Sequence, residues 1–389
     1  MHYVRYFIFE ERCAMIYFDN AATTKYKPEA VYKAVDFYLR EIGVSPGRGS
    51  YGIGIEASRM LYKSRCAVGK YFGMSRNDRV VFTKNSTEAI NLFFNGFLKK
   101  GDHVIISCYE HNAVLRPLQR LKEQGIIDYS IIQRDDLNLS AGELFDKYVT
   151  DKTKLLAMTL ASNLTGRIIF REDIYDYFHG KGITTFVDSS QGAGKIKLSM
   201  KNQKIDFLAF TGHKDLMAIP GVGGLCCESV AHLKPFIQGG TGVHGEQYTN
   251  PDIFPEGYEA GTLNMPAIWS MYAALDYLSD HFVEINATEK KLMNYLLDGL
   301  RRIDSVIVYD EENFRVATCS INVRRMSSDK LVSLLDKNGI CVRGGIHCAI
   351  LAHEAIGTVS TGTVRLSLNY MNTEQEIDTV LDVIKSVGD

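Results

Sequence analysis

The sequence of 389 residues has few cysteines, no excess of one charge and no long apolar run. Its eight cysteines include no Cys-x-x-Cys pair, which argues against a zinc knuckle or a redox dithiol and favours a cytoplasmic location. With 44 basic and 46 acidic side chains, no broad basic surface for nucleic acid is expected. No run of about 18 apolar residues is present to span a membrane. The length and the hydrophobic content of 46% instead indicate a globular protein with a large core.

Short apolar runs alternate with helix-periodic stretches through the first two thirds of the chain. Because buried parallel strands are continuously apolar and need helical crossovers, this alternation predicts an α/β fold with a mostly parallel sheet covered on both faces. The predicted strands are residues 79–83, 103–107, 129–132, 154–160, 183–188, 207–212 and 223–227, and the predicted helices are 28–42, 56–72, 86–99, 113–125, 140–149 and 171–181.

The eight prolines all lie between Pro28 and Pro266, and the pattern changes after the last of them. A long helical stretch runs from Pro266 to about residue 302, followed by strands at 306–309, 319–323 and 363–368 and helices at 328–338 and 373–386. We therefore expect a large domain at residues 16–265, with its N-terminal segment contributing to the smaller domain, and a smaller C-terminal α/β domain at 266–389.

One glycine motif is deceptive. Gly47, Gly49 and Gly52 match G-x-G-x-x-G, but a dinucleotide site needs a strand before this motif, and here it follows a helix. The segment 43–54 is instead expected to be a mobile loop near an active site, with a plain surface loop as the alternative.

Two neighbouring strands end in an acid and an amine. The run ITTFVD delivers Asp188 to its carboxyl end, and FLAFTGHK delivers Lys214 to another. Ligands bind outside the carboxyl ends of strands in open α/β sheets. A pyridoxal phosphate enzyme needs this pair, because an amine binds the cofactor aldehyde and a carboxylate holds the pyridine nitrogen protonated. Taken singly, Asp188 is better explained by a helix cap or a turn and Lys214 by solvation, and only their joint placement favours the cofactor site.

Further polar residues follow other predicted strands. Ser86 and Thr87 begin a predicted helix, where amides and hydroxyls bind phosphate or simply cap the helix. His111 and Asn163 come after two more strands, and His111 is placed either to stack on a flat ring or to make an ordinary hydrogen bond.

The C-terminal segment RGGIHCA places Cys348 among glycines, and we expect a flexible loop with a reactive thiol. Arg343 or His347 would lower the pKa of such a thiol, whereas most cysteines are buried small apolar residues. Arg365, on a predicted strand, offers the planar fork that binds a carboxylate.

Taken together, the motifs resemble those of class V aminotransferase-like cysteine desulfurases, in particular their selenocysteine lyase-like group. The resemblance covers residue 16 to the end of the chain. It implies an aminotransferase-type fold with a seven-stranded, mostly parallel sheet, a pyridoxal 5'-phosphate cofactor, a homodimer, and L-cysteine or L-selenocysteine as substrate, with a sulfur-acceptor protein as a further partner. The matching segments, in order, are FDNAATT (18–24), TEAIN (87–91), EH (110–111), SN with TG (162–166), VDSSQ (187–191), TGHK (211–214), AGT (260–262) and RGGIHCA (343–349).

Carried over by position, the resemblance implies a role for each site residue and no metal ligand. Lys214 would bind the cofactor covalently and act as acid and base, while Asp188 would pair with the pyridinium nitrogen. Cys348 would take the substrate sulfur as a persulfide, which leaves alanine. The other implied contacts are His111 stacked on the ring, Asn163 and Gln191 at the ring hydroxyl, Ser86, Thr87, Thr211 and His213 at the phosphate, Thr262 at the phosphate of the partner subunit, Arg365 at the substrate carboxylate and Arg343 as a second substrate-binding residue.

Three positions depart from the family pattern: Asp215 follows the lysine, Tyr51 stands where a histidine is common, and Leu263 replaces a usual proline. They leave the reaction open between cysteine desulfuration and two alternatives. One alternative is the selenocysteine lyase reaction, and the other is β-elimination or an aminotransferase-like reaction on another amino acid. A non-catalytic sulfur-transfer or regulatory homologue is the alternative outside enzymes.

The N-terminal residues give the first testable prediction. Residues 1–14 lack the ordered features of a signal peptide, and the strand-like segment IYFDN begins directly after Met15. We expect residues 1–15 to form an extension outside the fold, with translation starting at Met15. The intact mass of the natively expressed protein will then lack residues 1–14, and a mass that includes Met1 would contradict this.

Overall fold

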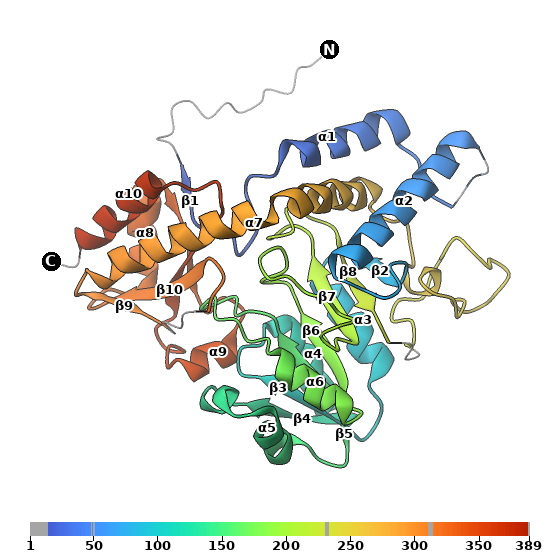
Figure 1. The fold of residues 1–389 in the computed structure, drawn as a ribbon, viewed down its shortest axis with the longest axis horizontal. Helices are drawn as coiled ribbons and strands as arrows, with labels where there is room; N and C mark the ends of the chain where they lie inside the picture. The colour runs from blue at the N-terminus through green and yellow to red at the C-terminus, as the bar shows by residue number, and fades with distance from the viewer. Residues whose placement is uncertain (1–14, 48, 50, 230–232, 310–313, 388–389) are drawn as a thin grey trace.

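The chain forms a larger and a smaller α/β unit that share one long helix. The computed structural model describes residues 15–47, 49, 51–229, 233–309 and 314–387, so the expected extension at 1–14 lies outside the described residues. Helix α7 (Met265–Arg301) passes along both units in Figure 1, and its C-terminal half reaches the smaller one. The division into domains at 16–265 and 266–389 stays a prediction, because α7 contributes residues to both cores.

The larger unit is built on a seven-stranded sheet. Only β8 among its strands runs antiparallel to its neighbours, which confirms the prediction of a mostly parallel sheet. In spatial order the strands are β2 (Val80–Thr83), β8 (Gly223–Cys227), β7 (Phe207–Thr211), β6 (Thr184–Asp188), β5 (Thr153–Thr159), β3 (Asp102–Ser107) and β4 (Ile127–Ile132).

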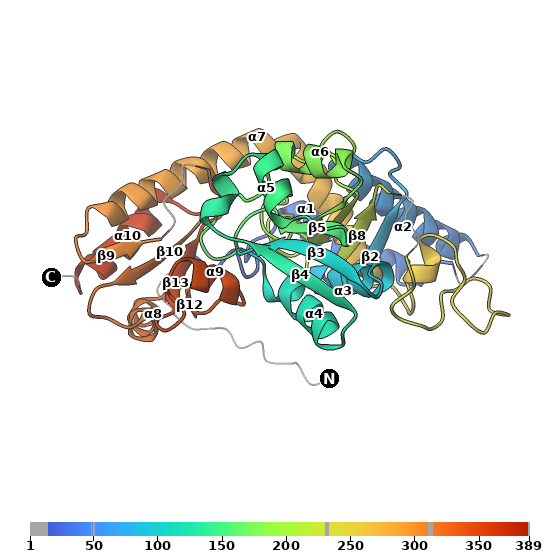
Figure 2. The ribbon, with the colours of Figure 1, turned by 90° about the horizontal axis from the view of Figure 1, so that it is seen from below.

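Helices bury both faces of this sheet, which explains why its strands are continuously apolar. Along β7, Phe207 and Ala209 belong to one core, and Leu208 and Phe210 belong to the other. In Figure 2, α3 and α4 lie below the sheet, and α5, α6 and α7 lie above it. The covering helices are α3 (Ser86–Phe97) and α4 (Asn112–Glu123) on one face, and α1 (Glu29–Phe37), α2 (Gly52–Tyr71), α5 (Ala141–Tyr148), α6 (Glu172–Gly180) and the first half of α7 on the other.

The smaller unit has its own core. The N-terminal segment packs there, since Ile16 and Phe18 are buried with Leu296 and Ile377. Its antiparallel sheet has the order β12 (Arg343–Gly345), β13 (Thr363–Ser367), β10 (Thr318–Val323) and β9 (Val306–Val308). Next to this sheet, β1 (Ile16–Tyr17) pairs in parallel with β11 (Ile340–Cys341). Helices α8 (Ser328–Lys337) and α10 (Glu374–Lys385) cover these strands. Within the described ranges, no helix combines the length and apolar content needed to cross a bilayer.

Two local expectations differ from the structure, and one element was not expected. The loop expected at 43–54 ends early, because α2 already begins at Gly52 after an extended Tyr51. The flexible loop expected around Cys348 begins as strand β12, which hydrogen bonding to β13 holds in place although it contains two glycines. A short helix, α9 (Ile350–Ala355), then follows Cys348 and was not expected.

A buried ion pair fastens α2 to the loop before α7. The Arg65 guanidinium donates to both carboxylate oxygens of Glu259 at 2.7 and 2.9 Å, and both side chains are buried. The backbone N–H of Phe82, on edge strand β2, donates to the same carboxylate at 2.6 Å. Helix α2, strand β2 and the Glu259 loop are thus joined at one point.

Glu259→Gln tests this junction. The substitution leaves the Arg65 guanidinium buried without its counter-charge, so we expect the free energy of unfolding to fall by about 3–5 kcal/mol. Urea denaturation measures it. Asp78→Asn is the matched control, because it removes the exposed pair Arg76–Asp78 at 2.8 Å and is expected to cost far less. Equal losses in the two variants would contradict the prediction.

Candidate active site

Four neighbouring strands deliver polar side chains to one edge of the large sheet. Strands β3, β5, β6 and β7 are parallel, so their carboxyl ends meet there. Asp188 is the last residue of β6, and Lys214 follows β7. His111 and Asn163 follow β3 and β5. The structure therefore brings together four residues that the sequence predicted for one site, at the place where open α/β sheets bind ligands.

Lys214 lies in a turn that is fixed through its backbone. Its carbonyl oxygen accepts hydrogen bonds from Thr24 Oγ1 at 2.5 Å and from the Met217 N–H at 2.8 Å. Burial lowers the pKa of the Lys214 amine from 10.5 to about 8, although the Asp188 carboxylate opposes the shift. A substantial fraction of the amine is therefore neutral near pH 8, as a nucleophilic lysine requires.

Asp188 is buried, with 2% of its surface exposed. Burial raises the pKa of its carboxyl above the usual range, while hydrogen bonds from Ser190 and the charge of Lys214 act in the opposite direction. The Ser190 N–H and hydroxyl donate to Oδ1 at 3.0 and 2.5 Å. Ser190 thus orients the carboxylate, a role that the sequence motif VDSSQ did not reveal.

The predicted phosphate ligands have polar groups available. Ser86 opens α3 and is buried, and Thr87 beside it is exposed. The Thr211 hydroxyl is buried and has no hydrogen-bond partner among the described residues. A buried hydroxyl without a partner is costly, so its geometry suits an acceptor that a ligand supplies. His213 and Thr262 line a neighbouring cavity of about 560 Å³.

His111 and Gln191 are held by backbone contacts. His111 precedes α4, and its Nδ1 accepts the Ala113 N–H at 3.0 Å, which leaves the ring proton on Nε2. Burial and the charge of Lys214 lower the pKa of His111 to about 3, so the ring is neutral near pH 7. Gln191 donates from Nε2 to the Ala21 carbonyl at 2.7 Å.

The exposed Cys348 sits in a turn anchored to the same edge. Its carbonyl accepts the N–H of Asn112, next to His111, at 2.8 Å, and Arg343 Nη2 lies 3.8 Å from its sulfur. His347 and Cys348 both have left-handed backbones, with φ of 55° and 56°. Such a turn is strained for residues other than glycine, and hydrogen bonds hold it. One of them runs from Asn163 Nδ2 to the His347 carbonyl at 2.7 Å.

Arg365 is almost fully buried, with 1% of its surface exposed. Its Nη2 donates to Asp19 Oδ1 at 2.6 Å and its Nη1 to the Asn163 carbonyl at 3.0 Å. Nε is buried without a partner among the described residues. Asp19 was missed as a site residue, although the motif FDNAATT contains it. Arg343 and Arg365 are paired residues of β12 and β13, so two guanidinium groups border the site.

Two separate cavities adjoin the edge. Cys348, His111 and Thr87 line one of about 490 Å³. His213 and Thr262 line the other, and Cys348 does not. No group of three His, Cys, Asp or Glu side chains arranged to hold a metal occurs in the part of the chain that the structure describes.

Comparisons with known proteins identify the family of this chain. Probable cysteine desulfurases of Methanothermobacter thermautotrophicus and Pyrococcus abyssi are 32% and 31% identical to this chain, over 96% of its length and 94% of theirs. A solved apo structure of a cysteine desulfurase from Thermococcus onnurineus NA1 matches with a TM-score of 0.86 and 30% identity, over 96% of this chain and 94% of the other. The profile of the family "Aminotransferase class-V" matches residues 16–380, and this chain belongs to that family.

Proposed function

We propose that this protein is a pyridoxal phosphate-dependent cysteine desulfurase that converts L-cysteine to L-alanine and transfers the sulfur to Cys348. The observation that carries the proposal is the attachment of the Cys348 turn to the edge that holds Lys214 and Asp188, through the Asn112 N–H and the Asn163 side chain. The printed names of the relatives support the same reaction.

The edge offers groups that suit pyridoxal phosphate. The cofactor, when bound, supplies an electron-accepting ring. Lys214 would hold it covalently, Asp188 would keep the ring nitrogen protonated, and the neutral His111 ring would lie against it. The remaining proposed contacts are Asn163 and Gln191 at the ring hydroxyl, Ser86, Thr87, Thr211 and His213 at the phosphate, and Thr262 at the phosphate of the partner subunit.

The protein's own groups would then bind and cleave the substrate. Arg365 and Arg343 carry the positive charge that a substrate carboxylate needs. The Cys348 thiolate bonds to the substrate sulfur, the bond from that sulfur to Cβ breaks, and its electrons stay with the carbon, which takes up a proton to give alanine. No outside oxidant or reductant is needed, because the transferred sulfur becomes the outer atom of a persulfide. Lys214, with a pKa of about 8, is suited to moving protons at the substrate carbons.

The proposed setting is a cytoplasmic homodimer that passes sulfur to an acceptor protein. Thr262 is compatible with the proposed contact to a partner subunit's phosphate, because it is exposed and lines a cavity that Cys348 does not line. The sparse cysteines of the sequence support a reducing compartment.

Cys348→Ala separates sulfur transfer from simple elimination. Without the thiol, alanine formation from cysteine should fall by more than about 100-fold, as losses of a nucleophile do. Mass spectrometry after exposure to cysteine should find one added sulfur on Cys348 of the wild type. Cys66→Ala is the control, because Cys66 is a half-buried residue of α2, and it should retain activity. Undiminished alanine release by Cys348→Ala would contradict the persulfide step.

Attachment of pyridoxal phosphate to the apoprotein should depend on pH through Lys214. Only the neutral amine reacts, so the attachment rate should rise with pH up to about 8 and then level off. The absorption band of the bound cofactor reports the rate. In Asp188→Asn the midpoint should move to lower pH, because the Asp188 charge raises the pKa of Lys214.

Lys214→Ala should lose this band altogether. Lys27→Met is the discriminating control, since burial also lowers the pKa of Lys27 to about 8, yet its amine donates to the His213 carbonyl at 3.0 Å. Loss of the band in Lys27→Met and its survival in Lys214→Ala would reverse the assignment.

A further inference from the structure

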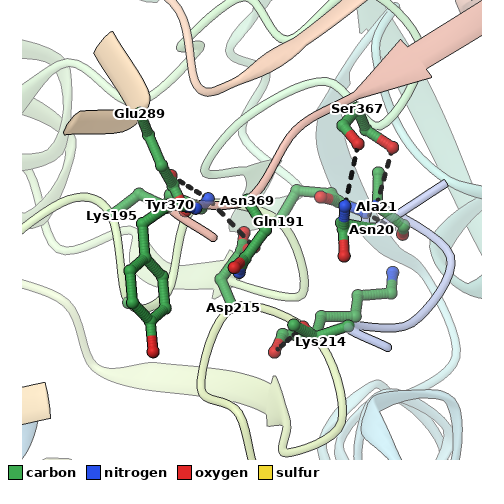
Figure 3. Close-up of polar contacts among 12 residues, drawn as sticks. Asn20, Ala21, Gln191, Lys195, Lys214, Asp215, Glu289, Ser367, Asn369 and Tyr370 are labelled. Atoms are coloured by element: carbon green, nitrogen blue, oxygen red, sulfur yellow. Dashed lines mark hydrogen bonds and ion pairs between the residues drawn. The ribbon is translucent and has the colours of Figure 1, made fainter. Parts of the chain in front are cut away.

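A buried cluster of charges lies directly beside the Lys214 turn. Lys195 contacts the Glu289 carboxylate and lies 3.4 Å from Asp215 Oδ1. The side chains of Lys195, Asp215 and Glu289 are only 7%, 8% and 3% exposed. Figure 3 shows Lys195 and Glu289 on one side of Asp215 and Lys214 on the other, with the Lys214 side chain extending away from the cluster. Neither the proposed reaction nor the proposed cofactor contacts make use of Lys195 or Glu289.

The cluster joins segments that are distant in the chain. Asp215 follows Lys214 directly, Glu289 belongs to α7, and Lys195 lies in the turn after β6. Glu289 also accepts the N–H of Tyr370 at 3.1 Å, in the segment that follows β13. Its Oε1 and Oε2 thus connect the smaller unit to Lys195, and Lys195 connects both to the Lys214 turn.

The backbone around the cluster is tightly packed. A Cβ at Gly194 would lie 2.3 Å from the Asp215 carbonyl oxygen, and Gly194 has a φ of 97°. Only glycine fits there without displacing the Lys214 turn. The turn carrying Lys195 is therefore pressed against Asp215.

The cluster holds one amine, Lys195, and two carboxylates, Asp215 and Glu289. Burial and the nearby Asp215 carboxylate raise the pKa of Glu289 to about 7. Burial lowers the pKa of Lys195, but the two carboxylates outweigh it and raise that pKa above the ordinary value. Lys195 is therefore a firmly protonated cation that neutralises Asp215. Without Lys195, the Asp215 carboxylate would lie beside the Lys214 turn with its negative charge uncompensated.

Other groups also face the residues concerned. Lys27 and the Tyr71 hydroxyl interact electrostatically with Asp215, and that hydroxyl has no hydrogen-bond partner among the described residues. The charged and titratable groups that act on or with Lys214 are Asp188, Arg365, Asp215, Arg343, His111 and His213. Of these, Asp215 is the only one that Lys195 contacts.

We propose that Lys195 is a positioning residue for Lys214: it neutralises Asp215 and clamps the Lys214 turn to α7 and to the segment after β13. The inference rests on the proposed function in one respect, that Lys214 is the reactive amine. It adds a chain-specific feature, because Asp215 is a departure from the family pattern at that position.

Lys195→Met tests the inference in the apoprotein. The amine of Lys214 is labelled with trace acetic anhydride between pH 6 and pH 10, and mass spectrometry of the digest gives its titration midpoint. Removing the cation should raise the midpoint by about 0.5–1 unit, a three- to tenfold change, as an added negative charge nearby does. Lys195→Met/Asp215→Asn, which removes both charges, should return the midpoint to the wild-type value.

The control is Lys291→Met, which removes an exposed α7 pair, Lys291–Glu374 at 2.8 Å, and should leave the midpoint unchanged. A role of Lys195 in stability alone would lower stability without moving the midpoint, and that result would overturn the inference. If Lys195→Met does not fold, Asp215→Asn gives the answer, because removing this negative charge should lower the midpoint. An unchanged midpoint there would overturn the inference as well.

The two proposals fail separately. Labelling of Lys214 needs no cofactor, so it reports on the cluster even in a protein that does not bind pyridoxal phosphate. Absence of the cofactor band in the wild type would count against the proposed function only. Wild-type binding with unshifted labelling midpoints in the Lys195 and Asp215 variants would count against the cluster only.

Discussion

The site depends on the parallel pairing of β6 with β7, which sets an acid and an amine at the same edge of the sheet. Parallel strands end at the same side of a sheet, so Asp188, the last residue of β6, and Lys214, just after β7, lie at the same edge. The helices that cover both faces remove water from the sheet, and the same burial that stabilises the fold moves the pKa of both groups toward each other's range. Burial of the sheet by helices therefore both stabilises the fold and shifts the pKa values of Asp188 and Lys214.

A second constraint is that the cysteine comes from the smaller unit. Its turn is held at the edge by hydrogen bonds across the boundary, from Asn163 to the His347 carbonyl and from the Asn112 N–H to the Cys348 carbonyl. Arg365 strengthens the same boundary, because its guanidinium reaches both Asp19 and the Asn163 carbonyl. An exposed thiol is thus anchored, through the backbone of its turn, to the sheet edge that holds the buried Lys214.

The sequence predicted the strands of the large sheet because each is an apolar run that two cores bury, as the alternation of Phe207 and Leu208 shows. It failed at β12, since a strand of Arg-Gly-Gly has no apolar pattern and is defined only by hydrogen bonds to β13. It also missed the ion pair of Arg365 with Asp19, 346 residues away, and that of Lys195 with Glu289, 94 residues away. The local pattern of apolar and polar residues does not show which buried charged side chains will form ion pairs.

A lowered pKa alone does not make a lysine reactive, as Lys27 and Lys214 show. Burial brings both amines to about 8. Lys27 donates a hydrogen bond to the His213 carbonyl at 3.0 Å, so its amine is held against the backbone of the Lys214 turn. Lys214 instead lies at the strand ends, where the Asp188 carboxylate acts on its amine and where the proposed cofactor would bind. The proposed difference in reactivity between the two amines would therefore come from their surroundings: the His213 carbonyl at Lys27, and the carboxylates of Asp188 and Asp215 at Lys214, of which Asp215 is also in contact with Lys195.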